Sequence, residues 1–212
     1  MASAHLRQRP DPSEHHPAYG PYLDAISIRE APGQAFDLTR YLESQSDALA
    51  TLLATVSEEG ALHRYAAGKW SVKEVVAHLT DVERVMAYRI LRIGRGDATP
   101  LPGFDENAWI EAGAHDRRPL EDHVAEFRAA RSDSLALIRG LPESAFPNRV
   151  VASGYPVTGR ALAWILAGHV DHHLRILQER YGVADPGASD SGTSDAGSSD
   201  AGSSGSASSG MP

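Results

Sequence analysis

The chain of 212 residues contains no cysteine. Disulfide bonds and thiolate ligands are therefore excluded, and any metal ion has to be bound by histidine, aspartate, glutamate or water. No stretch approaches the roughly 18 consecutive apolar residues of a transmembrane helix. The start of the chain is rich in proline, histidine and charge, and it lacks the apolar centre of a signal peptide. We therefore expect a cytoplasmic protein that does not act at a membrane.

Positive charge is also scarce. The chain carries 20 lysine and arginine residues against 28 aspartate and glutamate residues, a formal net charge of −8 at pH 7. A nucleic-acid-binding surface needs a basic stripe, and no cluster of lysine and arginine with interleaved aromatic residues occurs in the sequence. We therefore predict that the protein has no nucleic-acid partner.

The two ends of the chain lack the apolar residues that a core needs. Residues 1–20 are polar and broken by prolines, and residues 185–212 consist mostly of serine, glycine, alanine and aspartate. Such side chains cannot offset the entropy cost of ordering the backbone. We predict disorder in both segments and one folded domain over residues 21–184.

Four long segments show the apolar spacing of amphipathic helices. They cover residues 38–56, 71–93, 119–140 and 158–181. Strand signals are sparse, since only residues 149–152 form a short β-like run, followed by a turn at residues 154–156. The predicted fold class is therefore all-α, a four-helix bundle with disordered termini.

Two histidines lie four residues apart near the end of the last predicted helix. His169 and His173 share one face of that helix with apolar side chains, which are those of Leu162, Ile165 and Ile176. Two polar rings buried side by side cost free energy unless each has a partner. A divalent metal ion is one partner that satisfies both, because side chains at positions i and i+4 lie close together.

A third histidine follows a strong helix start. Ser71 and Glu74 have the spacing of a capping box, in which each side chain bonds to the backbone amide of the other residue. In the helix that begins there, His78 falls on or beside the apolar face. Three histidines from two helices, with one position left open, are the ligand set of a catalytic rather than a structural zinc-type site.

These two segments carry a family resemblance. Residues 69–78, with the pattern Trp-Ser-x-x-Glu-x-x-x-His, and residues 168–173, which end in His-x-x-x-His, resemble the DinB-like superfamily and are similar to its YfiT-type branch of metal-dependent hydrolases. The resemblance implies a four-helix bundle with a divalent metal, zinc or nickel, bound by His78, His169 and His173. Some relatives transfer low-molecular-weight thiols, which implies an external thiol as a co-substrate, and related bundles often form homodimers.

His172 competes for a place in this site. It lies three residues after His169, within reach of a shared ion, but towards the edge of the apolar face. We predict that His172 is a catalytic residue that carries protons, because histidine titrates near neutrality, and a ligand role is the alternative. Asp171 points away from the apolar face and is expected to be solvated. The other histidines are expected on the surface, and they are His5, His15, His16, His63, His115 and His123.

The carboxylates near these histidines have structural interpretations. Glu74 is a capping residue, and only a weaker candidate for supporting a ligand. Asp81 and Glu83 are expected on or near the solvated side of their helix. Asp105 is expected to cap a short helix, although both Asp105 and Glu106 can approach the metal. No Glu-x-x-His pair of a di-iron bundle occurs, which disfavours a ferritin-like site.

The connection between the second and third helices is unusually long. It spans residues 95–118, and connections of this length are uncommon unless they are functional or partly helical. We expect a short helix over residues 105–112. Phe104 and Trp109 supply apolar side chains, so we place this connection over the metal site as part of a substrate pocket.

The predicted function follows from the open metal position. A divalent ion on three neutral imidazoles promotes ionisation of a bound water near pH 7 or of a bound thiol. We therefore predict a metal-dependent enzyme for a small-molecule substrate, either a hydrolase that activates water or a transferase that activates an external thiol. The alternative is a non-catalytic metal-binding module with a stress-response or interaction role.

Overall fold

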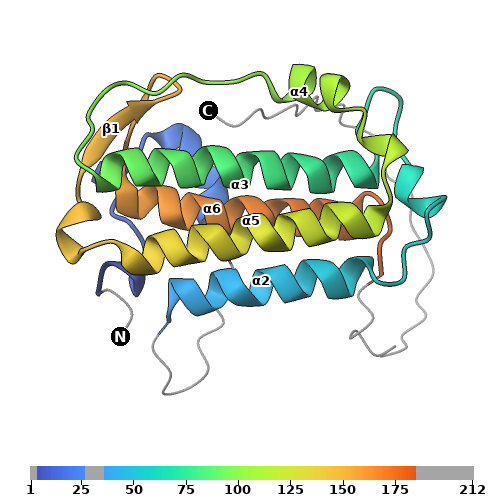
Figure 1. The fold of residues 1–212 in the computed structure, drawn as a ribbon, viewed down its shortest axis with the longest axis horizontal. Helices are drawn as coiled ribbons and strands as arrows, with labels where there is room; N and C mark the ends of the chain where they lie inside the picture. Colours follow the sequence, from blue (N-terminus) through green and yellow to red (C-terminus); the bar gives the residue numbers. More distant parts are fainter. Residues whose placement is uncertain (1–3, 27–35, 185–212) are drawn as a thin grey trace, which may run out of the picture.

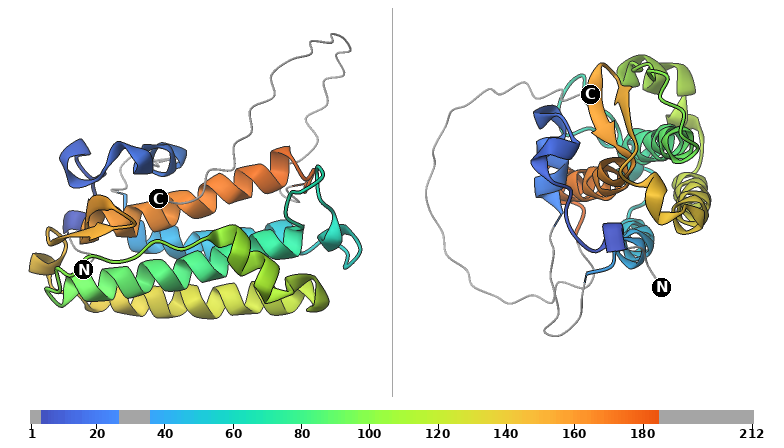
Figure 2. Two further views of the ribbon diagram at one scale, coloured as in Figure 1. Left: turned by 90° about the horizontal axis from the view of Figure 1, so that it is seen from above. Right: turned by 90° about the vertical axis from the view of Figure 1, so that its left-hand side faces the viewer.

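The computed structural model describes residues 4–26 and 36–184. Four long helices form a bundle (Figure 1), and they are α2 (Leu38–Leu53), α3 (Val72–Gly94), α5 (Leu120–Gly140) and α6 (Gly159–Glu179). Helix α3 packs against both α5 and α6, and α2 packs against the other side of that pair. The end-on view in Figure 2 shows the four helices together. The predicted all-α fold, a four-helix bundle, is confirmed.

Shorter elements join the long helices. They are α1 (Gly20–Ala25), α4 (Glu106–Gly113), β1 (Arg149–Ala152), β2 (Tyr155–Thr158) and the 3-10 turns η1 (Ala4–Leu6), η2 (Pro12–Glu14), η3 (Pro17–Tyr19), η4 (Gly60–Leu62), η5 (His115–Arg117) and η6 (Glu143–Ala145). The β-like run predicted from the sequence forms β1. It pairs with β2 as an antiparallel hairpin, in which Arg149 lies opposite Thr158. The sequence indicated a turn but not this second strand.

The long connection between α3 and α5 contains α4 and η5. The predicted short helix is present, one residue later than expected. Asp105 caps it, because its carboxylate accepts hydrogen bonds from the backbone amides of Asn107 at 3.0 Å and Ala108 at 3.1 Å. The prediction that Asp105 caps this helix is therefore confirmed.

The N-terminal segment corrects the prediction of disorder over residues 1–20. Residues 4–26 lie beside α6 (Figure 2), and Leu6 and Tyr19 are only 1% and 0% exposed. A Cβ atom added to Gly168 of α6 would lie 1.7 Å from the backbone oxygen of Tyr22, so glycine allows this close approach. The prediction was wrong for the described part because the buried side chains there outweigh the prolines. The predicted disorder of residues 185–212 lies outside the described residues.

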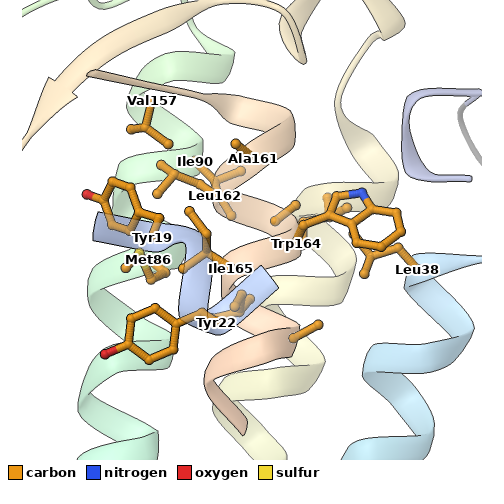
Figure 3. Packing of buried hydrophobic residues seen from close by; sticks show 14 of the residues in the cluster. Tyr19, Tyr22, Leu38, Met86, Ile90, Val157, Ala161, Leu162, Trp164 and Ile165 are labelled. Atoms are coloured by element: carbon orange, nitrogen blue, oxygen red, sulfur yellow. The ribbon is translucent and has the colours of Figure 1, made fainter. Parts of the chain in front are cut away.

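Two clusters of buried apolar residues form the core. One contains Met86 of α3 and Ile165 of α6 together with the N-terminal segment, and the other contains Leu79 of α3 and Val170 of α6. Figure 3 shows Tyr19 and Tyr22 on one side of α6 and Trp164 with Leu38 on the other. The border between the two clusters falls near the three histidines predicted as ligands.

None of the helices in the described parts of the chain is long and apolar enough to cross a membrane. The cytoplasmic location stays a prediction, and so does the homodimer.

Candidate metal centre

The two helices that carry the histidines begin at the residues expected from the sequence. Ser71 accepts a hydrogen bond from the amide of Glu74 at 3.1 Å, and Glu74 accepts one from the amide of Ser71 at 2.8 Å. The predicted capping box is therefore present at the start of α3. Thr158 caps α6 by accepting a hydrogen bond from the amide of Ala161 at 3.0 Å. These caps fix the ends of both helices next to the bundle core.

The structure brings His78, His169 and His173 together between α3 and α6. One ring nitrogen from each residue lies within 4.8 Å of the other two. The Nε2 atoms of His78 and His169 are 3.1 Å apart. All three side chains are buried, with exposed fractions of 4%, 2% and 8%. The cluster thus places three imidazoles at one point inside the bundle.

Burial keeps these imidazoles neutral. It lowers the pKa of His78 to about 4, with a smaller contribution from the charge of His172. Burial is also the main reason that the pKa values of His169 and His173 lie well below the usual range of histidine, and the neighbouring histidines lower them further. A neutral imidazole has a free lone pair on one nitrogen, which is the form that binds metals.

The arrangement fits a divalent metal ion. Two nitrogens bound at about 2.0–2.1 Å in tetrahedral geometry lie about 3.4 Å apart, close to the 3.1 Å between His78 and His169. The buried Nδ1 atom of His173 has no hydrogen-bond partner among the described residues. Buried polar atoms are rarely left in this state. A metal ion shared by the three rings would offset the cost of burying this imidazole.

A pocket opens beside the cluster, with a volume of about 150 Å³. The histidines that line it are His172 and His173. The other lining residues are Tyr65, Gly68, Lys69, Trp70, Val75, Glu106, Asn107, Ile176 and Tyr181. The cluster is therefore buried in the bundle but reachable from a cavity with polar and aromatic side chains, as an open coordination site requires.

The long connection contributes to this pocket, but with different residues from those expected. Glu106 and Asn107 at the start of α4 line it. Phe104 and Trp109 instead line a separate pocket together with Arg89. The prediction that these two aromatic residues form the wall of the histidine pocket is therefore wrong. Glu106 and Asn107 begin α4, whereas Phe104 precedes the helix and Trp109 lies further along it, and the two pairs line different cavities.

His172 lies at the edge of the histidine cluster. Its ring centroid is 5.1 Å from that of His173, and its half-buried side chain lines the pocket. Burial lowers the pKa of His172, and the charge of Arg175 lowers it further. The position agrees with the expected place at the site edge, and the catalytic role of His172 stays a prediction.

Tyr22 is a neighbour of the site that the sequence did not indicate. Its ring centroid lies 5.6 Å from that of His169 and 5.8 Å from that of His172. Burial raises the pKa of Tyr22 to about 12, and the nearby carboxylate of Glu106 adds to the rise. The only sequence signal was a short run of apolar residues, Tyr22-Leu23 and Ala25-Ile26, at the beginning of the predicted folded domain of residues 21–184.

Two carboxylates lie where the sequence did not place them. Asp171 was expected in solvent, but it accepts hydrogen bonds from the hydroxyl of Tyr41 and the amide of Gln45, both at 2.5 Å. Glu83 was expected on or near the solvated side, but it is 1% exposed and pairs with Arg131 at 2.8 Å. Both predictions were wrong because the partners belong to neighbouring helices.

The remaining candidates follow the structural interpretations more closely. Glu74 caps α3 and also pairs with Arg64, and Asp81 is half-buried beside Arg84. Of the histidines expected on the surface, His63 is exposed, whereas His5, His15, His16 and His115 are half-buried. His123 is the exception, with 1% exposure and its Nε2 atom 3.0 Å from the backbone oxygen of His115. Its expected surface position was wrong.

The fold and the site together define the class of protein: a four-helix bundle with a buried histidine cluster suited to a divalent metal. The model of the DinB superfamily matches residues 41–177, and the chain belongs to this superfamily.

Two known proteins are similar to the chain. A protein from Bacillus licheniformis named "Putative metal-dependent hydrolase" is 32% identical over 138 residues, which cover 59% of this chain and 73% of that protein. The structure of YfiT from Bacillus subtilis superposes with a TM-score of 0.57 and 21% identity, covering 75% of this chain and 95% of YfiT. YfiT is described as "a probable metal-dependent hydrolase with an unusual four-helix bundle topology", and at this identity the likeness concerns the fold.

Proposed function

We propose that His78, His169 and His173 bind one divalent metal ion, zinc or nickel, and that the protein is a metal-dependent hydrolase. The observation that carries this proposal is the convergence of three buried, neutral imidazoles within 4.8 Å of one another beside a pocket. The name of the Bacillus licheniformis relative supports the reaction class. The absence of cysteine leaves nitrogen and oxygen ligands, in agreement with a histidine site.

The residues of the chain have distinct roles in this proposal. When bound, a divalent ion supplies Lewis acidity, which lowers the pKa of a water or thiol and polarises the bond to be broken. The three histidines hold the ion, and their burial keeps bulk water away. Tyr181 donates a hydrogen bond to the backbone oxygen of Trp70 at 2.7 Å, which fixes one side of the pocket. His172 faces the same cavity, where its side chain can contact a substrate.

The metal part is tested by elemental analysis of the purified full-length chain, four variants of the site histidines and one control variant. We expect one ion per wild-type chain, almost none in His169→Ala and His173→Ala, and a strong reduction in His78→Ala. His172→Ala should keep a near-normal metal content while changing any activity. His63→Ala, on an exposed side chain, is the matched control and should behave as wild type. Full metal occupancy in His173→Ala would overturn the ligand assignment.

The reaction is tested with the metal-loaded protein and a panel of esters, amides and pairs of a small thiol with an electrophile. Turnover of an ester or amide that disappears on metal removal and returns on reloading supports the hydrolase. Turnover only with an added thiol would replace it by a transferase, whose thiol has to come from outside the chain because the chain has no cysteine. No turnover across the panel would favour a non-catalytic metal-binding module.

A further inference from the structure

A second pocket lies beside α3 and the beginning of α4. Its volume is about 380 Å³, within the range of small-molecule sites. It shares no lining residue with the histidine pocket. The lining residues are Asp81, Arg84, Val85, Tyr88, Arg89, Leu101, Pro102, Gly103, Phe104 and Trp109.

Arg89 is the unusual member of this pocket. Its side chain is 1% exposed, and its guanidinium donates to the backbone oxygen of Pro102 at 3.0 Å and to the hydroxyl of Ser153 at 2.7 Å. Among the described residues, no carboxylate lies within ion-pair distance of it. Burial lowers the pKa of Arg89, and the nearby Tyr19 only partly opposes this. The positive charge is thus buried without an anion.

A second buried arginine in the same bundle shows what is missing at Arg89. Arg131 is also 1% exposed, but it has Glu83 at 2.8 Å. Burying a charge without a counter-charge is costly, and native proteins pair such charges or give them ligands. The hydrogen bonds from Arg89 tie α3 to the loop and the hairpin. A neutral amide side chain would make such bonds without the cost of a buried charge.

The rest of the pocket is suited to a flat apolar group. Phe104 and Trp109 stack with their ring centroids 4.6 Å apart, and 43% of Trp109 is exposed. Tyr88 is 51% exposed on the same pocket. The other charged side chains of the pocket have partners, since Arg84 pairs with Glu126 at 2.7 Å and also lies 3.9 Å from Asp81. One positive charge, that of Arg89, therefore remains for a ligand.

We propose that this pocket binds a small organic monoanion with a planar apolar body, such as an aromatic carboxylate. Its anionic group lies next to the guanidinium of Arg89, and its ring covers the aromatic surface of Phe104 and Trp109. Charge-assisted hydrogen bonds to a guanidinium are roughly twice as strong as neutral ones, and stacking adds to the burial of apolar area. This site is independent of the proposed metal and of the hydrolase activity.

The test compares two probes of nearly equal shape, 1-naphthoate and the neutral 1-naphthamide, by isothermal titration calorimetry on the full-length protein. We expect saturable binding of 1-naphthoate that is about tenfold tighter than that of the amide. The affinity should be the same for metal-loaded and metal-free protein. Equal affinities of the two probes, or binding of 1-naphthoate only to the metal-loaded form, would overturn the proposal.

Three variants distinguish binding at this site from non-specific binding of the probes. Arg89→Gln should remove the preference for the carboxylate while leaving the amide affinity near its wild-type value. Trp109→Ala changes an exposed side chain, so the protein should still fold. This variant should lower the affinity for both probes about threefold to tenfold. Leu91→Ala is the matched control, because Leu91 is 38% exposed on α3 outside the pocket. Unchanged binding in Trp109→Ala would contradict the proposal even if Arg89→Gln failed to fold.

Discussion

The bundle buries two groups of polar side chains near one another, and only one of them is neutralised by the protein itself. Arg131 of α5 pairs with Glu83 of α3 at 2.8 Å, and both side chains are 1% exposed. The same guanidinium donates to the backbone oxygen of Leu42 and to the side-chain oxygen of Gln45, each at 3.1 Å. Within residues 4–26 and 36–184, the histidine cluster has no charged partner of this kind, and it borders a cavity.

The difference separates a structural polar group from one that needs a ligand. Each group has unsatisfied atoms, since Glu83 Oε1, Arg131 Nε and His173 Nδ1 are buried without hydrogen-bond partners among the described residues. In the ion pair, opposite charges nevertheless compensate each other. In the histidine cluster, three similar rings face one another, and a cation is the partner that all three can share. The ion pair therefore contributes to the stability of the fold, and the histidine cluster is suited to binding a ligand.

Gln45 of α2 connects the two groups. Its oxygen accepts from Arg131, and its amide donates to the backbone oxygen of Ala167 at 2.8 Å and to Asp171 at 2.5 Å. Both acceptors lie on α6 within two residues of His169. The ion pair thus orients Gln45, and Gln45 ties α2 to the part of α6 that carries the histidines.

The largest expected effect is a loss of stability when the buried ion pair of Arg131 and Glu83 is broken. Arg131→Met leaves Glu83 buried without its partner and should lower the free energy of unfolding by about 3–5 kcal/mol. The metal content of the folded protein should not change. Urea unfolding and elemental analysis measure the two effects. The control is Arg128→Ala, which breaks a pair with Asp47 whose side chains are 50% and 78% exposed, and which should cost less than about 1 kcal/mol.

The histidine cluster should make the metal-free protein sensitive to acid. The pKa of His78 is about 4 in the folded state, against about 6.5 when unfolded. Between these values the unfolded chain binds a proton that the folded chain does not, so stability falls as the pH drops from about 6.5 to about 4. The contribution of His78 is on the order of 3 kcal/mol. His78→Ala should therefore show a shallower pH dependence in urea unfolding, and an identical slope would contradict the burial argument.

Metal binding should stabilise the wild-type protein but not a ligand variant. At a free metal concentration a hundredfold above the Kd, the folded state gains about 2.7 kcal/mol. The thermal unfolding midpoint of the wild type should rise on adding zinc, whereas that of His169→Ala should stay constant. Arg131→Met should retain the rise from its lower starting point. An equal rise in wild type and His169→Ala would place the ion elsewhere.

Structural features that depend on residues close together in the chain could be predicted from the sequence. The capping box of Ser71 and Glu74, the Asp105 cap and the four-residue spacing of His169 and His173 each lie within one or two turns of helix. Backbone geometry alone fixes such relations. The bundle class followed from the apolar periodicity of four segments, and the four long helices of the structure confirm it.

Contacts between distant segments could not be predicted in the same way. Asp171 and Glu83 face partners on other helices, and a helix face read from one segment does not show what the neighbouring segment offers. The N-terminal segment packs against α6 through Tyr22 and Gly168, which lie far apart in the sequence. The buried Arg89 likewise became visible only when its surroundings were known.

The central claim is that three imidazoles share one cation in the bundle, and the X-ray absorption spectrum of zinc in the full-length protein tests it most directly. The account predicts one zinc site with three imidazole nitrogens at about 2.0–2.1 Å and one further light ligand. It also predicts that this imidazole scattering weakens or disappears in His78→Ala. A first shell made of oxygen atoms alone, or a spectrum unchanged by His78→Ala, would contradict the claim.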